Sequence, residues 1–532
     1  MSDEKRPEYV VGQDNVEKFG FDVHNPVFFL SGLVTVLFVL FALIFKEDAA
    51  KMFGDLRPYL TNNFDWVFMI AGNIFVLVCL FLIVSPYGKI RLGGQDAKPD
   101  YSYAGWFAML FAAGMGIGLM FYGVLEPVYH MQNPPLGVDP ANTELAREVG
   151  MAATIFHWGL HPWAIYAVVA LALAFFCYNR GLPLTIRAAF YPLVGKAAWG
   201  WFGHIVDILA VFATLFGLAT SLGLGAEQAG AGLSYLFGIE STDYTKVALI
   251  IGITAVALIS VVAGLEAGVK RLSEINMVLA AVLLIFIIAV GPTLDIVAGF
   301  FNNTVAYLEH LPALSNWIDR EDESFMQGWT TFYWAWWISW SPFVGMFIAR
   351  VSRGRTVREF ITCVLIIPTL VSILWMTVFG GTAIDQIVND GYQGVTETIA
   401  AWTPELSLFK MLDQLPMTQI ASLVGIVLVI VFFVTSSDSG SLVIDTITAG
   451  GKVDAPTRQR VFWCVIEGLI AIALLLGGGL ASLQAAAIAT GFPFAIVLVL
   501  MCVSIIIGLA REKRRVWGAS GKVAKEAAKE KA

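Results

Sequence analysis

Apolar runs long enough to cross a membrane recur along the whole chain, separated by shorter polar and charged segments. Twelve such runs are present, at 27–46, 64–86, 102–126, 152–178, 204–236, 245–266, 275–298, 328–350, 358–380, 417–447, 460–480 and 485–510. About 20 apolar residues in a helix cross the ~30 Å hydrocarbon core of a bilayer. The pattern therefore predicts an all-α polytopic membrane protein with twelve transmembrane helices.

The composition supports this interpretation and narrows the function. Of the 532 residues, 58% are hydrophobic and 14% are charged, whereas a soluble domain carries about 25% charged residues. No polar segment is long enough for an ATPase domain, so transport driven by an ion gradient is the first expectation, and a gated channel or membrane receptor is the alternative. We expect no enzyme activity, no covalent cofactor and no nucleic-acid partner, because no nucleophile–base pair or metal-binding cluster stands out.

The charges of the loops alternate along the chain. Lys and Arg gather after the second, fourth, sixth, eighth and tenth runs, as at Arg353 and Arg355, whereas Asp and Glu dominate the loops between them. Cytoplasmic loops are the ones rich in Lys and Arg. The alternation predicts a protein of the bacterial cytoplasmic (inner) membrane with both termini in the cytoplasm.

Three segments outside the spans have expected roles. Residues 1–26 form a cytoplasmic N-terminal segment, and residues 299–327 are expected to include an amphipathic helix on the outer face. The basic tail, 511–532, is expected to form a short helix near anionic lipids of the inner leaflet. A plain solvated tail is the alternative.

The eighth run carries an unusual concentration of tryptophan, WTTFYWAWWISWSPF at 329–343. On a helix, Trp336, Trp337 and Trp340 lie within an arc of about 100° and form one aromatic face. A tryptophan belt at the membrane surface explains Trp329 but not these three, which lie in the middle of the run. A group of aromatic faces suits a quaternary ammonium ligand, because the rings attract a cation that cannot donate a strong hydrogen bond.

The fourth run, IFHWGLHPWAIYAV, offers a second wall for such a site. Trp158, Trp163 and Tyr166 lie within about 140° on a continuous helix. His157 and His161 are spaced by four residues and could share a metal ion, but no third ligand is apparent in the sequence. We interpret the two histidines as buried polar groups.

The third run contains Gly114, Gly116 and Gly118 within FAAGMGIGLMFYG. Glycines at alternate positions do not share a helix face, and each weakens a helix by roughly 1 kcal/mol relative to alanine. Unwound backbone inside a membrane is tolerated where it lines a cavity, and its carbonyls can bind Na⁺. Close helix packing is the alternative. Glu126-Pro127 is expected to end this span.

The tenth run carries the polar sequence TSSDS at 435–439 within apolar surroundings. Polar groups at this depth are costly unless they have partners, so they indicate an ion or substrate path. The hydroxyls of Thr435 and Ser436 suit Na⁺. Hydrogen bonds between helices are the alternative.

Together these segments resemble the betaine/carnitine/choline transporter family. The resemblance rests on GMGIGLMFYG (114–123), HWGLHPWAIY (157–166), WAWWISWSPFVGMFIARVSRGRTVREF (334–360) and TSSDS (435–439), and it is strongest to the Na⁺-coupled glycine betaine symporters. Choline/proton members typically have Asp where this chain has Gly118. The resemblance implies the LeuT-type symporter fold, with two inverted five-helix repeats at 102–298 and 328–510 after two extra helices at 27–101.

The resemblance also implies the binding residues. The predicted substrate-binding residues are Trp158, Trp163, Tyr166, Trp336, Trp337, Trp340, Gly114, Gly116 and Gly118. One Na⁺ site is implied at Ala112, Met115, Phe432, Thr435 and Ser436, and a second at Thr214 and Phe343. Leu218 stands where a threonine contributes to that second site in relatives, although Thr220 or Ser221 could compensate.

The expected function is import of glycine betaine, an osmoprotectant, by Na⁺ symport with alternating access. The alternatives are Na⁺- or H⁺-coupled uptake of choline, dimethylsulfoniopropionate, carnitine or ectoine, and sodium-independent exchange of onium compounds. By resemblance the protein is a homotrimer with the helix of 299–327 at the interface.

Overall fold

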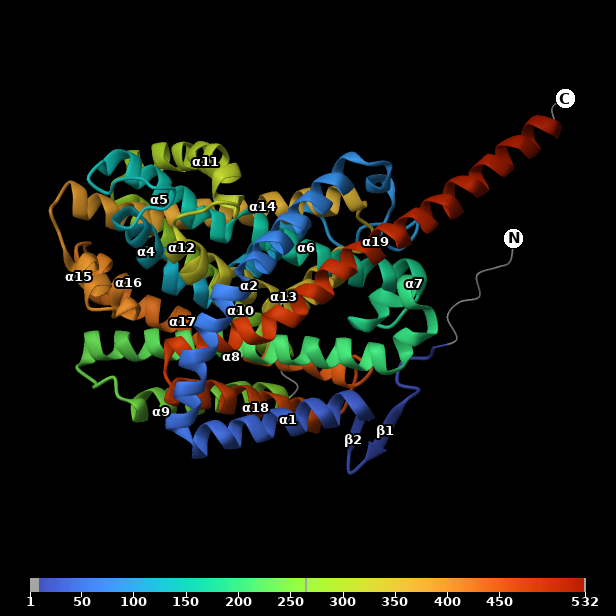
Figure 1. Cartoon of the computed structure of the whole chain (residues 1–532), viewed down its shortest axis with the longest axis horizontal. Coiled ribbons are helices and arrows are strands. Elements are labelled where there is room, and N and C mark those ends of the chain that lie inside the picture. Colours follow the sequence, from blue (N-terminus) through green and yellow to red (C-terminus); the bar gives the residue numbers. More distant parts are fainter. Residues whose placement is uncertain (1–8, 264–265, 531–532) are drawn as a thin grey trace.

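The computed structural model describes residues 9–263 and 266–530, and these residues are almost entirely helical (Figure 1). A short hairpin at the N-terminus consists of β1 (Asn15–Lys18) and β2 (Phe21–His24). The helices are α1 (Asn25–Ile44), α2 (Lys46–Val84), α3 (Tyr103–Gly114), α4 (Ile117–Gln132), α5 (Thr143–Trp158), α6 (Leu160–Ala174), α7 (Tyr191–Val194), α8 (Trp201–Phe237), α9 (Asp243–Ala263), α10 (Glu266–Val290), α11 (Thr293–Ser315), α12 (Glu323–Phe325), α13 (Thr331–Val351), α14 (Val357–Val388), α15 (Gly394–Ala400), α16 (Ser407–Asp413), α17 (Thr418–Thr448), α18 (Thr457–Leu476) and α19 (Leu480–Glu530).

The number of apolar spans is close to the prediction. Within the described residues, ten helices are long and apolar enough to cross a membrane, or eleven when the bent pair α3 and α4 counts as one span. The remaining predicted run is α13, whose 21 residues would extend about 31 Å. This length is enough to cross a bilayer, although α13 is not among the helices that are apolar enough to be counted as spans.

Several predicted boundaries were wrong. α2 begins at Lys46 and contains 39 residues up to Val84, so its first turns are polar helix rather than loop. α10 ends at Val290 because Gly291 and Pro292 follow, and α11 starts directly afterwards at Thr293. The basic tail is helical up to Glu530, and its helix is the continuation of the last span within α19. Residues 1–8 and 531–532 of the predicted terminal segments lie outside the described residues.

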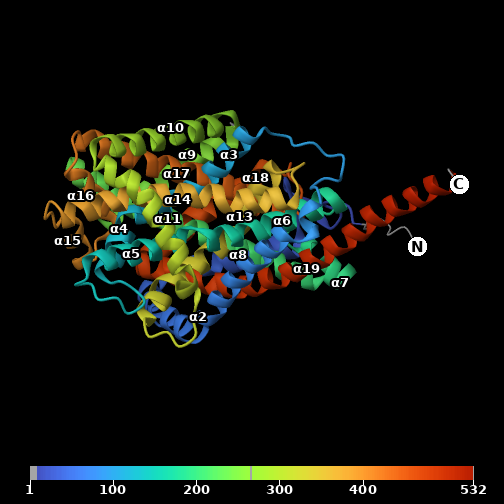
Figure 2. The ribbon, with the colours of Figure 1, turned by 90° about the horizontal axis from the view of Figure 1, so that it is seen from above.

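The N-terminal hairpin and the C-terminal part of α19 lie at the same end of the molecule (Figure 1). Figure 1 shows the N-terminal hairpin close to the side from which the last turns of α19 project, and Figure 2 shows the same arrangement from above. The hairpin is fastened there by Asp22, whose carboxylate pairs with Lys452 and whose backbone N–H donates to Gln459. This arrangement agrees with termini on one side of the membrane.

Two helices break near the centre of the molecule. α3 and α4 meet at an angle of 65°, and α5 gives way to α6 at Gly159, where a Cβ would lie 2.7 Å from the Ile155 carbonyl oxygen and 2.9 Å from the Tyr307 hydroxyl. α13 packs along α6 and α8, and α17 packs along α8. The two breaks and the middle of α13 and α17 therefore surround one central region.

Glu126-Pro127 does not end the third span, contrary to the sequence prediction. α4 continues through Pro127 to Gln132. Pro127 packs against Gly380 of α14, where an added Cβ would lie only 2.3 Å from the proline ring. A proline is tolerated inside a membrane helix when neighbouring helices accommodate it, and the bare glycine backbone does so here.

Candidate functional site

A cavity of about 270 Å³ lies at the central helix breaks, near the lower limit of roughly 300–1,000 Å³ for small-molecule sites. It is lined by residues of α3, α4, α5, α6, α8, α10, α13 and α17. Fourteen predicted binding residues line it, namely Ala112, Gly114, Met115, Gly116, Gly118, Trp158, Tyr166, Trp336, Trp337, Trp340, Phe343, Phe432, Thr435 and Ser436. The four sequence motifs thus meet in one place, with space for a small solute.

The broken helix supplies backbone groups of both polarities to the cavity. α3 ends at Gly114 and α4 begins at Ile117, and Met115 and Gly116 between them are extended. The last carbonyls of a helix and the first N–H groups of the next have no partner within the helix, and they carry partial negative and positive charge. The glycine pattern predicted this break, whose carbonyl oxygens suit a cation and whose N–H groups suit an anion.

The glycines at the break have different surroundings. A Cβ added to Gly118 would lie 2.8 Å from ring atoms of both Trp158 and Trp336, whereas a Cβ on Gly116 would have nothing within 4 Å. A Cβ on Gly114 would lie 3.2 Å from Trp163. Gly118 is thus required for close approach of the rings, and Gly116 faces open space.

The aromatic side chains form a corner of rings around the cavity. The ring of Trp158 stands nearly perpendicular to those of Trp337 and Trp336, with centroids 5.1 and 6.4 Å away. Tyr166 is edge-on to Trp337 at 5.6 Å. Trp340 lines the cavity from the next turn of α13. Perpendicular rings present faces from several directions, which is the arrangement that surrounds a bulky cation.

The four cavity-lining indoles use their N–H groups within the protein. Trp158 donates to Glu126 Oε2 (2.8 Å) and Trp336 to Ser221 Oγ (3.2 Å). Trp337 donates to the carbonyl of His157 and Trp340 to that of Gly217, both at 2.9 Å. An indole N–H is the ring's only strong donor. With these donors engaged, the rings offer a ligand their π-faces and hydrocarbon edges.

Trp163 was predicted in the box but is not among the residues that line the cavity. It packs behind Gly114 and beside Tyr166, with a centroid distance of 5.4 Å to the latter. The prediction assumed one continuous helix through Trp158 and Trp163, and the break at Gly159 changes their relative orientation. Trp163 therefore supports the box from behind.

The cavity also has a polar wall, to which α10 contributes two residues that the sequence analysis missed. Ser273 and Asn276 of α10 line the cavity together with Thr435, Ser436 and Ser439 of α17, which belong to the predicted polar sequence TSSDS. Asn276 is 1% exposed, and neither end of its amide has a hydrogen-bond partner in the described part of the chain. An asparagine within a predicted span was the available signal, because such residues mark polar paths.

The second predicted Na⁺ site is not assembled in the same way. Phe343 lines the cavity, but Thr214 and Leu218 do not, and Thr214 donates to the Ala210 carbonyl at 2.7 Å. Leu218 packs on Gly440, where a Cβ would lie 2.3 Å from its Cδ1. The two hydroxyls that could compensate have other partners: Thr220 donates to the carbonyl of Leu483, and Ser221 accepts from Trp336.

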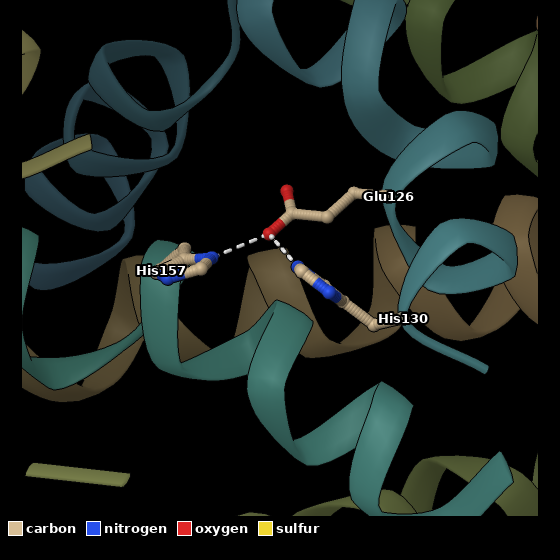
Figure 3. Close-up of side chains that lie close together, drawn as sticks. All are labelled: Glu126, His130 and His157. Carbon is tan, nitrogen blue, oxygen red and sulfur yellow. Dashed lines mark hydrogen bonds and ion pairs between the residues drawn. The ribbon is translucent and has the colours of Figure 1, made fainter. Parts of the chain in front are cut away.

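Behind the aromatic corner lies a fully buried polar cluster (Figure 3). Glu126 and His130 lie one turn apart on α4, and His157 reaches them from α5. Glu126 Oε1 is 2.6 Å from His157 Nδ1 and 3.4 Å from His130 Nε2. Two ligands of one tetrahedral Zn²⁺ would lie about 3.3 Å apart, so the shorter distance is that of a hydrogen bond rather than of a shared metal.

His157 and His161 bond to different partners rather than to a shared one. His157 bonds to Glu126 and, through Nε2, to Thr330 at 2.9 Å. His161 Nε2 instead bonds to the Asn73 side chain of α2, also at 2.9 Å. Both histidines are buried polar groups, as we interpreted them.

Comparison with known proteins identifies the family. A profile of the betaine/carnitine/choline family transporters matches residues 26–514. A glycine betaine/proline/choline transporter of Vibrio parahaemolyticus is 61% identical over 95% of this chain and 94% of its own, and glycine betaine transporter 1 of the same species is 57% identical over 95% and 98%. A glycine betaine transporter of Bacillus subtilis is 42% identical over 92% and 96%. The chain therefore belongs to the betaine/carnitine/choline transporter family and is a membrane transporter rather than an enzyme.

Proposed function

We propose that the protein imports glycine betaine by Na⁺ symport. The observation that carries this proposal is the aromatic corner whose indole N–H groups all bond within the protein. A trimethylammonium group has no strong donor and needs ring faces, each worth about 0.5–2 kcal/mol when water is excluded. The names of the relatives, which transport glycine betaine, support the same substrate.

The broken helix offers a binding site for the carboxylate end of the substrate. We assign the substrate carboxylate to the first N–H groups of α4, around Gly116 and Gly118, because a helix N-terminus attracts anions. Gly116 leaves open space beside these groups. Choline has no carboxylate and would leave these donors unused, so we expect it to bind more weakly.

The coupling ion is assigned to the opposite side of the break. Ala112, Met115, Phe432, Thr435 and Ser436 line the same cavity as the rings, and they would supply backbone carbonyls and side-chain hydroxyls to the ion. Hard oxygen ligands suit Na⁺. We propose a single Na⁺ per substrate, because Leu218 places hydrocarbon where the second site would need a hydroxyl.

Coupling to Na⁺ also provides the driving force. Glycine betaine is a zwitterion of net charge zero, so the membrane potential alone cannot concentrate it. Each co-transported Na⁺ contributes about 2.3 kcal/mol per 100 mV and about 1.4 kcal/mol per tenfold gradient. One Na⁺ is therefore enough to concentrate the substrate as an osmoprotectant.

The remaining features of the proposal concern the whole molecule. Two inverted five-helix repeats would alternate access to the central cavity in the inner membrane, with cytoplasmic termini and the basic tail near anionic lipids. α11 supports the trimer, because one apolar stripe along it is at least half exposed, comprising Leu294, Val297, Phe301, Val305 and Leu308. A stripe of this kind requires lipid or another subunit to cover it.

The test is uptake of labelled glycine betaine into proteoliposomes that contain the purified protein. We expect accumulation with an inward Na⁺ gradient and none with a proton gradient alone, with weak competition by choline. Uptake that needs no Na⁺ would overturn the symport mechanism and favour exchange of onium compounds. Tighter binding of choline than of glycine betaine would overturn the substrate assignment.

A further inference from the structure

Glu126 is a buried carboxylate that does not line the cavity but touches its wall. It is 0% exposed, within an apolar stretch of α4. Its Oε2 accepts from Trp158 Nε1 at 2.8 Å and from the Tyr333 hydroxyl at 2.5 Å. Its Oε1 faces the two imidazoles of the cluster in Figure 3. A charged group at this depth is expensive, which makes Glu126 a candidate functional residue.

The geometry around this group is that of an ionised carboxylate. An indole N–H can only donate, so Oε2 must accept from Trp158. The 2.5 Å separation from Tyr333 falls in the range of O–H···O⁻ hydrogen bonds. In a neutral carboxylic acid one oxygen would carry a proton, so the group would accept fewer hydrogen bonds from these donors. The negative charge therefore lies one hydrogen bond away from a ring of the box.

A hydrogen bond to a carboxylate changes the ring that donates it. Charge-assisted hydrogen bonds are about twice as strong as neutral ones, and they polarise the donor, particularly where water is excluded. For Trp158 this shifts electron density toward the indole π-system, whose faces line the cavity. A more negative π-face attracts a cation more strongly.

We propose that Glu126 is a specificity-determining residue that acts through Trp158, strengthening the attraction of the aromatic corner for an onium head group over a neutral one of the same shape. The inference rests on the proposed binding of glycine betaine. It assigns to the cluster of Glu126, His130 and His157 a role in substrate selection, with the two imidazoles holding the carboxylate in place.

The experiment compares two ligands that differ in charge but not in shape. Binding of glycine betaine and of 3,3-dimethylbutanoate, whose tert-butyl group replaces trimethylammonium, is measured with the wild-type protein and with Glu126→Gln. The amide can still accept from Trp158 with its oxygen and donate to His157 Nδ1 with its nitrogen, so it removes charge with little change of shape. We expect the Kd for betaine to rise about fivefold and that for 3,3-dimethylbutanoate, whose head group is uncharged, to change less than twofold.

Two further variants separate this role from a merely structural one. In a Trp158→Phe background, which has no indole N–H, Glu126→Gln should have no further effect on betaine. Tyr333→Phe removes a competing donor from Oε2 and should leave betaine binding equal or tighter, whereas a purely structural network predicts weaker binding. Glu467→Gln, at another fully buried carboxyl group that accepts from Ser437, is the matched control and should change neither Kd.

The outcomes are distinct. Equal losses for both ligands in Glu126→Gln, or an unchanged betaine Kd, would overturn the inference while leaving the proposed function intact. Should Glu126→Gln not fold, the Tyr333→Phe result decides between the two roles. Failure of the wild-type protein itself to bind glycine betaine would instead overturn the proposed function.

Discussion

The aromatic wall and the polar wall of the central cavity differ in whether their polar atoms have hydrogen-bond partners. On the aromatic wall every indole N–H of the four tryptophans has a partner in the protein, so these four side chains present only ring surface. On the polar wall, formed by α10 and α17, the amide of Asn276 has no hydrogen-bond partner among the described residues, and Ser436 and Ser439 line the same cavity. The first wall is complete without a ligand, and the second offers oxygen and nitrogen atoms that a ligand or ion can use.

This difference suggests how one small cavity can bind two unlike ligands, glycine betaine and Na⁺. A rigid set of rings selects by shape and charge and costs little entropy on binding. Unused polar groups inside a membrane are unfavourable until something binds to them, so their wall should favour an ion or a carboxylate. Substitutions on the aromatic wall should therefore change the affinity for betaine. Substitutions on the polar wall should change the dependence of transport on Na⁺.

The largest effect is expected from Trp337→Leu. Trp337 lies in the corner between Trp158 and Tyr166, so its loss opens the box and removes a cation–π contact. We expect roughly a 30-fold higher Kd for glycine betaine, measured by binding to the purified protein, with an unchanged Na⁺ dependence. Trp66→Leu is the control, because that indole is 49% exposed on α2. Similar affinities for wild type and Trp337→Leu would contradict the box.

Ser436→Ala, a substitution on the polar wall, should change the Na⁺ requirement and leave the affinity for betaine unchanged. It removes one hydroxyl ligand from the proposed Na⁺ site, and we expect the Na⁺ concentration for half-maximal uptake to rise about tenfold. The betaine Kd at saturating Na⁺ should stay the same. Ser441→Ala is a suitable control, since its hydroxyl donates to the Asp438 carbonyl and does not line the cavity. An unchanged Na⁺ requirement would remove Ser436 from the site.

A pair of glycine variants tests the aromatic wall without touching a ring. Gly118→Ala would place a methyl group 2.8 Å from Trp158 and Trp336, and the rings must move apart. We expect about a fivefold loss of betaine affinity from this overpacking. Gly116→Ala meets nothing within 4 Å and should cost less. Titration of both variants with betaine gives the comparison, and a larger loss for Gly116→Ala would show that open space at the break matters more than ring packing.

The smallest effect is expected for Asn276→Ala. Asn276 lines the cavity, and its amide has no hydrogen-bond partner in the part of the chain that the structure describes, so its removal leaves none of those groups newly unsatisfied. We expect about a threefold change in the Na⁺ or substrate concentration for half-maximal uptake. Asn303→Ala, which removes a bond to Thr377 away from the cavity, serves as the control. Transport kinetics identical to wild type would mean that the amide takes no part in either ligand's path.

Much of the fold followed from the sequence alone. Hydropathy depends on local composition, so the apolar runs could be found from the sequence. Eleven of the twelve runs correspond to described helices, one of them the bent pair α3 and α4, that are long and apolar enough to cross a membrane. Glycine weakens a helix wherever it stands, so the break between α3 and α4 was also predictable. The spacing of Trp336, Trp337 and Trp340 placed them on one face because α13 is a continuous helix. These are properties of short segments, and short segments can be interpreted without knowing their neighbours.

Only the tertiary structure decided which side chains meet. Trp163 does not line the cavity although Trp158 and Tyr166 on either side of it do, and packing on Gly380 lets α4 pass through Pro127. The packing of α10 brings Asn276 to the cavity, and its own run does not indicate which residues it would meet there. The bond between Glu126 and Trp158 joins residues 32 positions apart. Such contacts depend on how helices pack across the molecule. Periodicity and composition describe one helix at a time, so they carry no information about the partner that another helix supplies.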